Sequence, residues 1–592
     1  MQENKKKSFA KAVDLPVLKR IFAFVKPYRK NFFLAVFTTI VLAVLSPLRP
    51  LLIQHTFNNY IAIPNESMVF KMTMLLIGLL FSEAIIQFLD SYLTNRLGQN
   101  IIRDLRVRLF RHILGLRLKY YDNTPIGTLV TRAVSDIEVI ANIFSEGLIV
   151  IIGDLLKLSV IICAMLFINF ELALISLSSV PVLLIATYIF KKAVSVSFNE
   201  VRTQVSRLNA FVQEHLTGMN IVQIFNREEA EMEKFDKINT SHRDANIRSI
   251  MAYSIFFPVV EILSAISLGL LVWYGGRGIV QSTTTIGELI AFIMYIHMMF
   301  RPIRQLADRF NTLQMGVISS ERVFKLLDTD ETIENKGVLS ADEIKGNVEF
   351  KNVWFSYQDE NWVLKNVSFS VKQGETVALV GATGAGKSSI INLLNRSYEY
   401  NKGEILIDDK NVREFELGSL SKNIGVVLQD VFLFSDSILN NISLNNPDIS
   451  REKIIEASKI VGAHDFISAL PGNYDYNVKE RGAMLSAGQR QLISFIRAYV
   501  YDPKLLILDE ATSSIDTESE TLIQRATEIL TKDRTSIVIA HRLATIQKAD
   551  KIIVMDHGEV VETGNHQELL RMNGFYKRLF DLQFKEVTVR EL

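Results

Sequence analysis

Six long apolar runs in the first half of the chain constrain its fold more than any other feature. They cover residues 31–53, 70–89, 147–168, 172–190, 253–276 and 286–303. Each has about 18 to 24 residues, and a helix of that length crosses roughly 30 Å of hydrocarbon at about 1.5 Å per residue. Buried helices of a soluble protein rarely come as six such runs in succession. The sequence therefore predicts a membrane α-helical domain with six transmembrane helices, in residues 1–310.

Lysine and arginine are distributed unevenly among the loops that connect these runs. The two long loops, after the second and the fourth run, are rich in both residues, whereas the three short loops contain only Arg277. Because positively charged loops stay on the cytoplasmic side, both long loops and both termini are expected in the cytoplasm. The N-terminal stretch has no apolar core of the kind found in a cleaved signal peptide. We expect a multi-pass protein of a bacterial plasma membrane.

The pattern changes after about residue 345, where short β-type runs alternate with helical segments. These runs are residues 348–357, 367–381, 404–409, 505–510, 536–541 and 551–556. Alternation of strands and helices is typical of an α/β domain, which we place at residues 346–592. The stretch 311–345 is amphipathic and then polar, and we interpret it as a linker. The formal net charge of +1 gives no indication of nucleic acid as a partner.

A glycine-rich segment, GATGAGKSS (381–389), follows an apolar strand and opens a helical run. This is the G-x-x-x-x-G-K-[ST] pattern in its required context, so a P-loop is predicted. Gly381, Gly384 and Gly386 let successive backbone N–H groups point at phosphate oxygens, and the helix N-terminus adds partial positive charge. Lys387 is expected to reach the β- and γ-phosphates of ATP, Ser388 to bind Mg²⁺, and Ser389 to contact the nucleotide. The alternative is a chance glycine turn.

The segment LLILDE (505–510) supplies carboxylates that suit the same chemistry. Asp509, at the end of a buried strand, can hold Mg²⁺ through water. Glu510 follows directly and can orient and deprotonate an attacking water. Without the P-loop, Asp509 and Glu510 would be interpreted as an ordinary acidic pair at the end of a strand. His541 ends the next β-type run and is a candidate hydrogen-bond donor to the γ-phosphate, although a lone histidine there is more often structural.

Together these motifs resemble the nucleotide-binding domain of an ABC transporter, and residues 15–585 are similar to an ABC exporter half-transporter. The resemblance implies that Tyr357 stacks on adenine, that Gln429 senses Mg²⁺ and faces the membrane domain, and that His541 is the switch histidine. It also implies that Asp516, in SSID (513–516), lies at a dimer interface. In VKERG (478–482), Lys479 occupies a position where the family usually has glycine.

The segment LSAGQ (485–489) fits the signature of this family, which is normally LSGGQ. The resemblance implies that Ser486, Gly488 and Gln489 contact the γ-phosphate of an ATP held by a second nucleotide-binding domain. The chain has one P-loop and one signature, so a dimer with a second half-transporter is implied. If Ala487 needed φ > 0, alanine would cost on the order of 1 kcal/mol. This departure favours a heterodimer, in which the chain is the catalytically more complete subunit, over a homodimer.

The two long loops match the family's patterns at 120–136 and 214–229, where short helices are expected to dock onto nucleotide-binding domains. The leading hypothesis for function is ATP-hydrolysis-driven export of hydrophobic or amphiphilic compounds, with ATP and Mg²⁺ as cofactors. The alternatives are a flippase for lipids or lipid-linked precursors, and an ATP-gated channel or regulatory subunit.

Charged residues within the apolar runs give a first indication of which kind of cargo the chain could bind. We expect Asp154 and Lys157, three residues apart, to form a local ion pair. Glu83 and Glu261 are candidates for a cavity that takes cationic amphiphiles, although structural pairing is the simpler interpretation. Aromatic and methionine residues of the sixth run can form an apolar wall for cargo or serve helix packing.

Overall fold

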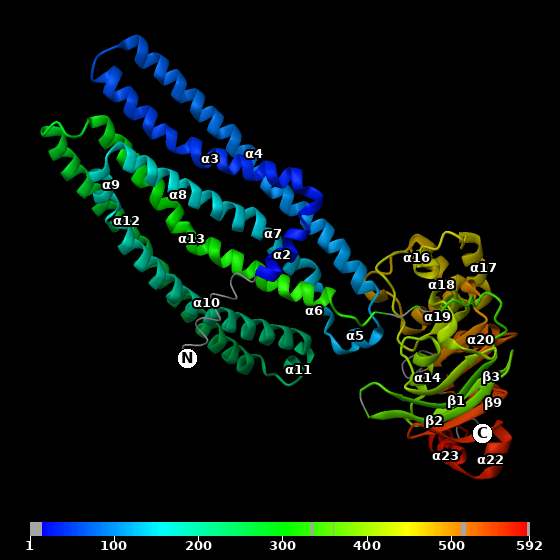
Figure 1. The fold of residues 1–592 in the computed structure, drawn as a ribbon. Helices are drawn as coiled ribbons and strands as arrows, with labels where there is room; N and C mark the ends of the chain where they lie inside the picture. The colour runs from blue at the N-terminus through cyan, green and yellow to red at the C-terminus, as the bar shows by residue number, and fades with distance from the viewer. Residues whose placement is uncertain are drawn as a thin grey trace. The chain divides into compact units, whose positions relative to one another are not determined.

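The computed structural model describes residues 15–332, 335, 337–358, 360–510, 517–540 and 542–588, apart from some side chains within these ranges. The chain divides into two compact units (Figure 1). The first, here the helical unit, comprises Met1–Leu114 and Ile126–Asp330. The second, here the α/β unit, comprises Gly115–Pro125 and Glu331–Leu592. A short piece of the first long loop thus belongs to the α/β unit.

The helical unit contains the six long apolar helices that the sequence predicts, each long enough to cross a membrane. The long helices are α3 (Arg29–Thr56), α4 (Glu66–Leu114), α8 (Leu148–Ile168), α9 (Phe170–Leu177) followed by α10 (Val180–Thr217), α12 (Glu228–Val280) and α13 (Ile286–Leu327). Shorter elements are α2 (Leu15–Ala23), η1 (Lys26–Tyr28), η2 (Phe57–Ile61), α6 (Ile126–Thr131), η3 (Arg132–Asp136), α7 (Ile137–Asn142), η4 (Ile143–Gly147) and α11 (Met219–Ile224).

Four of the long helices continue far beyond their apolar runs. α4, α10 and α12 extend into the two long loops, and α13 continues to Leu327, through the first part of the predicted linker. The two long loops are therefore mostly helical extensions. The α2 helix is tied to the end of α13 by Arg20, whose guanidinium donates to both carboxylate oxygens of Asp328 at 2.5 and 2.6 Å.

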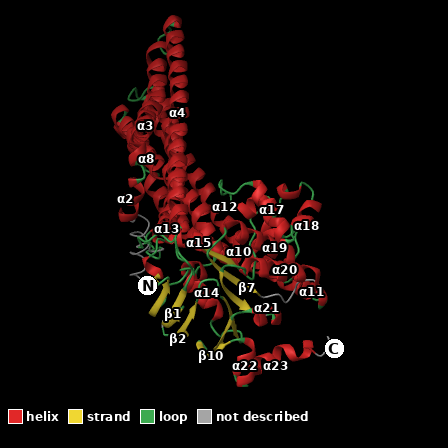
Figure 2. Cartoon of the chain, turned by 90° about the vertical axis from the view of Figure 1, so that its right-hand side faces the viewer, coloured by secondary structure: helices red, strands yellow, loops and turns green. Residues whose placement is uncertain are grey.

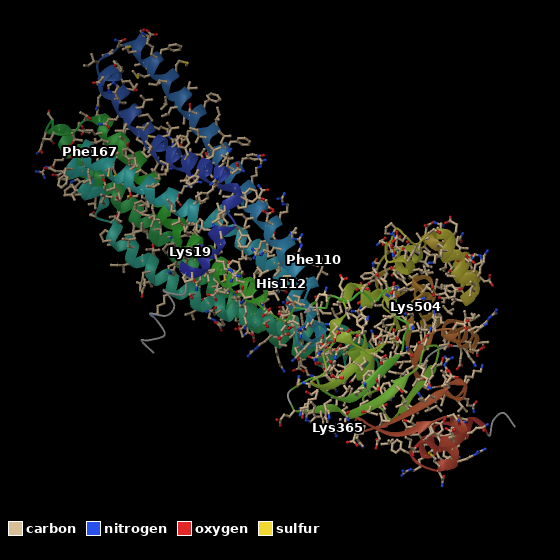
Figure 3. The ribbon with its side chains drawn as sticks, turned by 45° about the vertical axis from the view of Figure 1, so that its right-hand side comes forward. Lys19, Phe110, His112, Phe167, Lys365 and Lys504 are labelled. Atoms are coloured by element: carbon tan, nitrogen blue, oxygen red, sulfur yellow. The ribbon has the colours of Figure 1, made fainter. Side chains whose placement is uncertain are left out.

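Much of the apolar surface of the helical unit faces outward. The most apolar window of α4 contains no buried residue, and Phe167, near the end of α8, is 91% exposed (Figure 3). Apolar surface of this extent is unfavourable in water and favourable against lipid tails. The chain is a multi-pass membrane protein.

The α/β unit is built around two sheets (Figure 2). The larger has the strand order β10-β9-β3-β8-β7-β6, and its neighbours are parallel from β9 to β6. The smaller is antiparallel, with the order β2-β1-β4-β5. The strands are β1 (Val348–Ser356), β2 (Trp362–Val371), β3 (Thr376–Gly381), β4 (Lys402–Ile407), β5 (Lys410–Asn411), β6 (Ile424–Val427), β7 (Leu505–Glu510), β8 (Thr535–Ala540), β9 (Lys551–Asp556) and β10 (Glu559–Gly564).

Helices connect and cover these strands. They are α5 (Leu118–Asn123), α14 (Lys387–Leu394), α15 (Leu417–Asn423), α16 (Ile438–Ser443), α17 (Arg451–Val461), α18 (His464–Ala469), α19 (Ala487–Tyr501), α20 (Thr517–Thr531), α21 (Leu543–Lys548), α22 (His566–Met572) and α23 (Phe575–Thr588), with single turns η5 (Val412–Glu414), η6 (Asn473–Asp475) and η7 (Glu480–Gly482).

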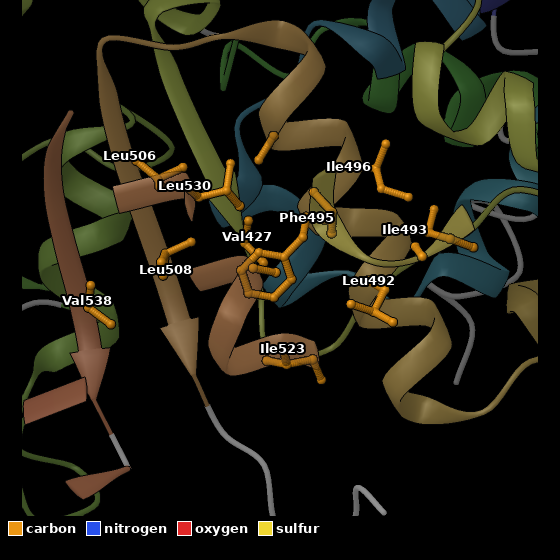
Figure 4. Close-up of a cluster of buried hydrophobic side chains, with 14 of the residues drawn as sticks. Val427, Leu492, Ile493, Phe495, Ile496, Leu506, Leu508, Ile523, Leu530 and Val538 are labelled. Carbon is orange, nitrogen blue, oxygen red and sulfur yellow. The ribbon is translucent and has the colours of Figure 1, made fainter. Parts of the chain in front are cut away.

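The parallel strands are buried on both faces, and alternate residues serve different cores. Leu506 and Leu508 of β7 pack with α19 and α20 in one cluster (Figure 4). Leu505 and Ile507 of the same strand lie in the other cluster, which includes strands of the smaller sheet. This two-residue period explains the continuous apolar run LLIL.

Candidate nucleotide site

The carboxyl ends of four parallel strands gather most of the predicted site residues at one edge of the larger sheet. In the register of the sheet, Leu379 of β3 is opposite Ile539 of β8, and Ala540 of β8 is opposite Glu510 of β7. Val427 of β6 is opposite Leu508 of β7. The P-loop after β3, the acidic pair at the end of β7 and the segment after β6 therefore share this edge. Open α/β sheets bind ligands at the carboxyl ends of their strands.

The P-loop has the backbone that its glycines allow. Gly384 and Gly386 have φ values of 84° and 98°, a region that side chains strongly disfavour. Gly381 is needed for a different reason, because a Cβ there would lie 2.3 Å from the carbonyl oxygen of Met555. The loop runs into α14, which begins at Lys387. Its first N–H groups are available to phosphate oxygens, and the helix adds partial positive charge at the same point.

Lys387 lies inside the loop and is mostly buried. Its ammonium donates to the carbonyl oxygens of Gly381 at 2.6 Å and Ala382 at 2.9 Å. Burial lowers the pKa of Lys387, and the nearby charge of Asp509 offsets part of that effect. The amine is thus held inside the loop by two carbonyl oxygens, with the carboxylate of Asp509 within electrostatic range.

The residues proposed for Mg²⁺ suit a metal that is held only together with phosphates. Ser388 is exposed in the first turn of α14, Gln429 is exposed just after β6, and Asp509 precedes the last residue of β7. Over the described ranges, no group of three or more His, Cys, Asp or Glu residues could hold a metal alone. Mg²⁺ commonly takes one or two protein oxygens and completes its shell with water and substrate phosphate. The donor set fits that pattern.

Three further predicted residues lie partly or wholly outside the described part of the chain. The backbone of Glu510 forms the last residue of β7, but its side chain is not described. His541 follows directly after β8 and, like Asp516, lies outside the described residues.

Tyr357, the predicted adenine contact, is connected to the P-loop helix. Its hydroxyl shares a hydrogen bond of 3.0 Å with the Ser389 hydroxyl, and Asn392 Nδ2 donates to it at 3.2 Å. Its ring packs edge-on against Phe355 and Tyr398, with centroid separations of 4.7 and 4.9 Å. Ser389, predicted as a ligand contact, thus positions the tyrosine in this structure.

The signature segment forms the start of α19. The Ser486 hydroxyl accepts from the Gln489 N–H at 3.1 Å, and the Gln489 side chain accepts from the Ser486 N–H at 3.0 Å. This reciprocal capping fixes the helix start at Ala487. Ala487 is the first helical residue and has no positive φ. The strain that would set this chain apart from LSGGQ sequences is therefore absent, and the main argument for a heterodimer loses its physical basis.

Replacing Ala487 with glycine is expected to lower the thermal stability of the α/β unit slightly and not to raise the ATPase rate. Glycine in a helix costs up to about 1 kcal/mol relative to alanine, and less near a helix start. Thermal unfolding and ATPase assays of the two proteins check this. A marked gain of ATPase activity on Ala487→Gly would show that the methyl group obstructs the signature.

Lys479, by contrast, occupies a position with a backbone that suits glycine. Its φ and ψ are 60° and −169°, a combination that is essentially restricted to glycine. Its N–H donates to the Asn477 side chain at 2.8 Å. Lysine in place of the family's usual glycine is thus accompanied by strain in the backbone of Lys479.

Replacing Lys479 with glycine is expected to stabilise the α/β unit by about 1 kcal/mol, because relief of strain exceeds the extra entropy of glycine in the unfolded chain. Thermal unfolding measures the shift. The matched control is Lys453→Gly in α17, where φ is helical and a loss of about 1 kcal/mol is expected. Equal losses for both variants would contradict this account of Lys479.

The α5 helix of the first long loop is part of the α/β unit and contacts a residue that the sequence did not single out. Tyr398 is 8% exposed as a residue, and its hydroxyl donates to the Asp122 carboxylate in α5. Burial and this bond raise the pKa of Tyr398, which therefore stays a proton donor. The segment is also held by Arg117, whose N–H and Nε donate to the carbonyl oxygens of Glu331 and Thr332, each at 2.9 Å. Tyr398 thus connects the loop to Tyr357.

Tyr398→Phe and Asp122→Leu are each expected to lower the melting temperature, and the double variant by little more than the larger single loss. A hydrogen bond to a charged group contributes about 1.5–3 kcal/mol, and a shared bond can be lost only once. Tyr400→Phe is the control, because its hydroxyl donates instead to Asn411. Additive losses from Tyr398→Phe and Asp122→Leu would show that the bond is not formed.

Comparison with known proteins places both units in one family. The model for "ABC transporter transmembrane region" matches residues 32–303, and the model for "ABC transporter" matches residues 364–513. A Bacillus subtilis protein named uncharacterized ABC transporter ATP-binding protein YknV is 38% identical, with 95% of this chain and 94% of the relative covered. The putative ABC transporter ATP-binding protein exp8 of Streptococcus pneumoniae is 37% identical, over 96% and 97% of the two chains. The putative multidrug export ATP-binding/permease protein YgaD of Bacillus subtilis is 36% identical, over 96% and 99%.

Proposed function

The chain belongs to the ABC transporter family, as an exporter with fused transmembrane and ATPase domains, and from that premise we propose that it exports hydrophobic or amphiphilic compounds across the plasma membrane. The observation that carries the proposal is the shared sheet edge, where the P-loop, Asp509 and Glu510 meet in a chain with six membrane helices. The relative YgaD, named for multidrug export, supports this cargo class.

We assign the steps of ATP hydrolysis to the residues at this edge. The P-loop N–H groups and Lys387 bind the phosphates, and Tyr357 stacks on adenine. Mg²⁺, held through Ser388, Gln429 and Asp509, neutralises phosphate charge when bound. Glu510 orients and deprotonates the attacking water, and His541 contacts the γ-phosphate.

ABC half-transporters act as dimers, and we propose that the signature of one chain completes the ATP site of the other. Ser486, Gly488 and Gln489 then face the partner's γ-phosphate, with Asp516 nearby at the interface. Because the backbone of Ala487 is unstrained, a homodimer needs no special adjustment of this segment, while a heterodimer remains the alternative.

The second long loop supports the same arrangement. The α11 helix at its tip presents exposed apolar side chains: Ile221 is 60% exposed and Ile224 75%. The α/β unit exposes Phe432 and Phe434 shortly after Gln429, at 55% and 57%. We propose that α11 docks onto this apolar surface of the second half-transporter, which joins hydrolysis near Gln429 to helix movement.

The Mg-ATPase rate of the purified chain in lipid nanodiscs tests the ATPase and the dimer together, with Glu510→Gln as the blank. A rate well above the blank means that the chain completes ATP sites with its own copy. A rate equal to the blank in folded protein would contradict the homodimer and direct the search to a second subunit.

A lipid or lipid-linked precursor flippase uses the same ATPase domain, and the cavity described below is the observation that favours this second function. A purely regulatory subunit is less consistent with the chain, because Lys387, Asp509, Glu510 and His541 are all present.

A further inference from the structure

The helical unit contains a cavity of about 770 Å³ between α3, α4, α8 and α13. Its lining is unexpectedly polar for a transmembrane region. The ionisable residues along it are Arg49, Glu83, Asp90, Asp154, Lys157, His297, Arg301 and Arg309. Charged side chains are costly at membrane depth, and they mark substrate or ion pathways when they face an internal cavity.

Two of the three carboxylates are occupied by partners within the helical unit. Asp154 forms an ion pair of 2.6 Å with Arg309, rather than the local pair with Lys157 that the sequence suggests. Asp90 accepts hydrogen bonds from the hydroxyls of Thr38 at 2.9 Å and Thr39 at 2.7 Å.

The remaining charges share one cavity. Lys157 lines it together with Glu83, Asp154, Arg49 and Arg301. Because Asp154 is neutralised by Arg309, two carboxylates, Glu83 and Asp90, are left to the three cations Arg49, Lys157 and Arg301 among the described lining residues. The cluster therefore has an excess of positive charge.

Unsatisfied donors lie on the same wall. The Nε of Arg49 and the hydroxyls of Ser46 and Thr94 are buried and have no hydrogen-bond partner within the described part of the chain. All three residues line the cavity. Buried donors of this kind cost about 1–3 kcal/mol each when unpaired, so a ligand that supplies acceptor oxygens is stabilised there.

We propose that this cavity binds the anionic headgroup, a phosphate or carboxylate, of an amphiphilic cargo. The inference deepens the proposed export function and rests on it. Lys157, Arg49 and Arg301 would contact the anionic oxygens, and an arginine can bind phosphate through two parallel hydrogen bonds. Ser46 and Thr94 would donate further hydrogen bonds.

The sequence offers Glu83 and Glu261 as candidates for a cavity that takes cationic amphiphiles, and the structure argues against that interpretation. Glu83 lines the cavity together with four cations, Arg49, Lys157, Arg301 and Arg309, and Glu261 is not part of the cavity lining. Of the aromatic and methionine residues of the sixth run, Phe292, Tyr295, Met299 and Phe300 are at most 2% exposed and belong to a buried cluster, whereas Met298 lines the cavity.

Native mass spectrometry of the full chain, titrated with dodecyl phosphate and with dodecyltrimethylammonium, tests the proposal. We expect dodecyl phosphate to bind at least about tenfold more tightly than dodecyltrimethylammonium. The double variant Lys157→Gln/Arg301→Gln should weaken dodecyl phosphate binding by about a hundredfold, since each of the two lost charged hydrogen bonds is worth about tenfold. Lys192→Gln, an exposed lysine of α10 outside the cavity, is the matched control and should bind like the parent. Lys157→Arg keeps the charge and should retain binding.

Equal binding of the two amphiphiles, or unchanged binding of dodecyl phosphate by a folded double variant, would overturn the proposal. Inorganic phosphate, added as a competitor of dodecyl phosphate, distinguishes the source of the anion. If it displaces dodecyl phosphate only weakly, the cargo is lipid-like; if it binds as tightly as dodecyl phosphate, the site takes a soluble anion. Binding is measured without ATP, so loss of ATP-driven export alone would refute the proposed function and leave this site standing.

Discussion

Replacing Glu510 with glutamine is expected to reduce the Mg-ATPase rate by a factor on the order of 100 to 10,000, the usual contribution of a general base. The residue ends β7, directly after Asp509 and opposite the end of β8. Glutamine has nearly the same shape as glutamate but cannot accept the proton of the attacking water. ATP binding depends on the P-loop and should persist, so the variant is expected to bind ATP and not to turn it over.

The control for this change is Glu456→Gln, an exposed glutamate of α17 that lies outside both sheets. It should keep the parent rate. ATPase assays give the rate, and a filter-binding assay with labelled ATP gives the affinity. If the ATPase rate of the Glu510→Gln variant stays within a few-fold of the parent rate, another group must activate the attacking water.

Replacing Lys387 with methionine is expected to weaken ATP binding by roughly 10- to 150-fold, which corresponds to the loss of one charged hydrogen bond of about 1.5–3 kcal/mol. The ammonium lies inside the P-loop, where it donates to the carbonyl oxygens of Gly381 and Ala382. Methionine keeps the length of the side chain and removes its charge. Hydrolysis should fall further than binding, because negative charge moves between phosphate oxygens in the transition state.

Lys504→Met is the matched control, because Lys504 is an exposed lysine between α19 and β7 (Figure 3). It should bind and hydrolyse ATP like the parent. Because methionine at a buried site can disturb the loop, thermal unfolding of Lys387→Met should accompany the assay. Unchanged ATP affinity in a folded variant would contradict the role given to the lysine.

The regular parts of the fold were predictable from the sequence, because they depend on periodic burial. Six apolar runs gave six long helices, and the run LLIL gave a strand buried on both faces. The strands β6 and β10 were not predicted. β6 has only four residues, and β10 alternates between partly buried and exposed positions at the sheet edge. Such short or half-exposed strands have a weak sequence pattern.

The site was predictable as a set of motifs, while its local geometry was not. Spacing indicated the P-loop and the acidic pair, but the backbone angles of Ala487 and Lys479 depend on the capping of α19 and on the turn before it. Tyr398 was missed because its role depends on Asp122, which lies 276 positions away in the chain. The pairing of Asp154 with Arg309 was missed for the same reason, since sequence alone favours near neighbours such as Lys157.

Active export is tested most directly by uptake into inside-out membrane vesicles that contain the chain, with a fluorescent amphiphile as the reporter. We expect the amphiphile to be concentrated inside only when Mg-ATP is supplied, and vesicles with Glu510→Gln to show no accumulation. Equilibration of the reporter without concentration, at the same rate in parent and Glu510→Gln vesicles, would contradict active export and point to a nucleotide-gated pore.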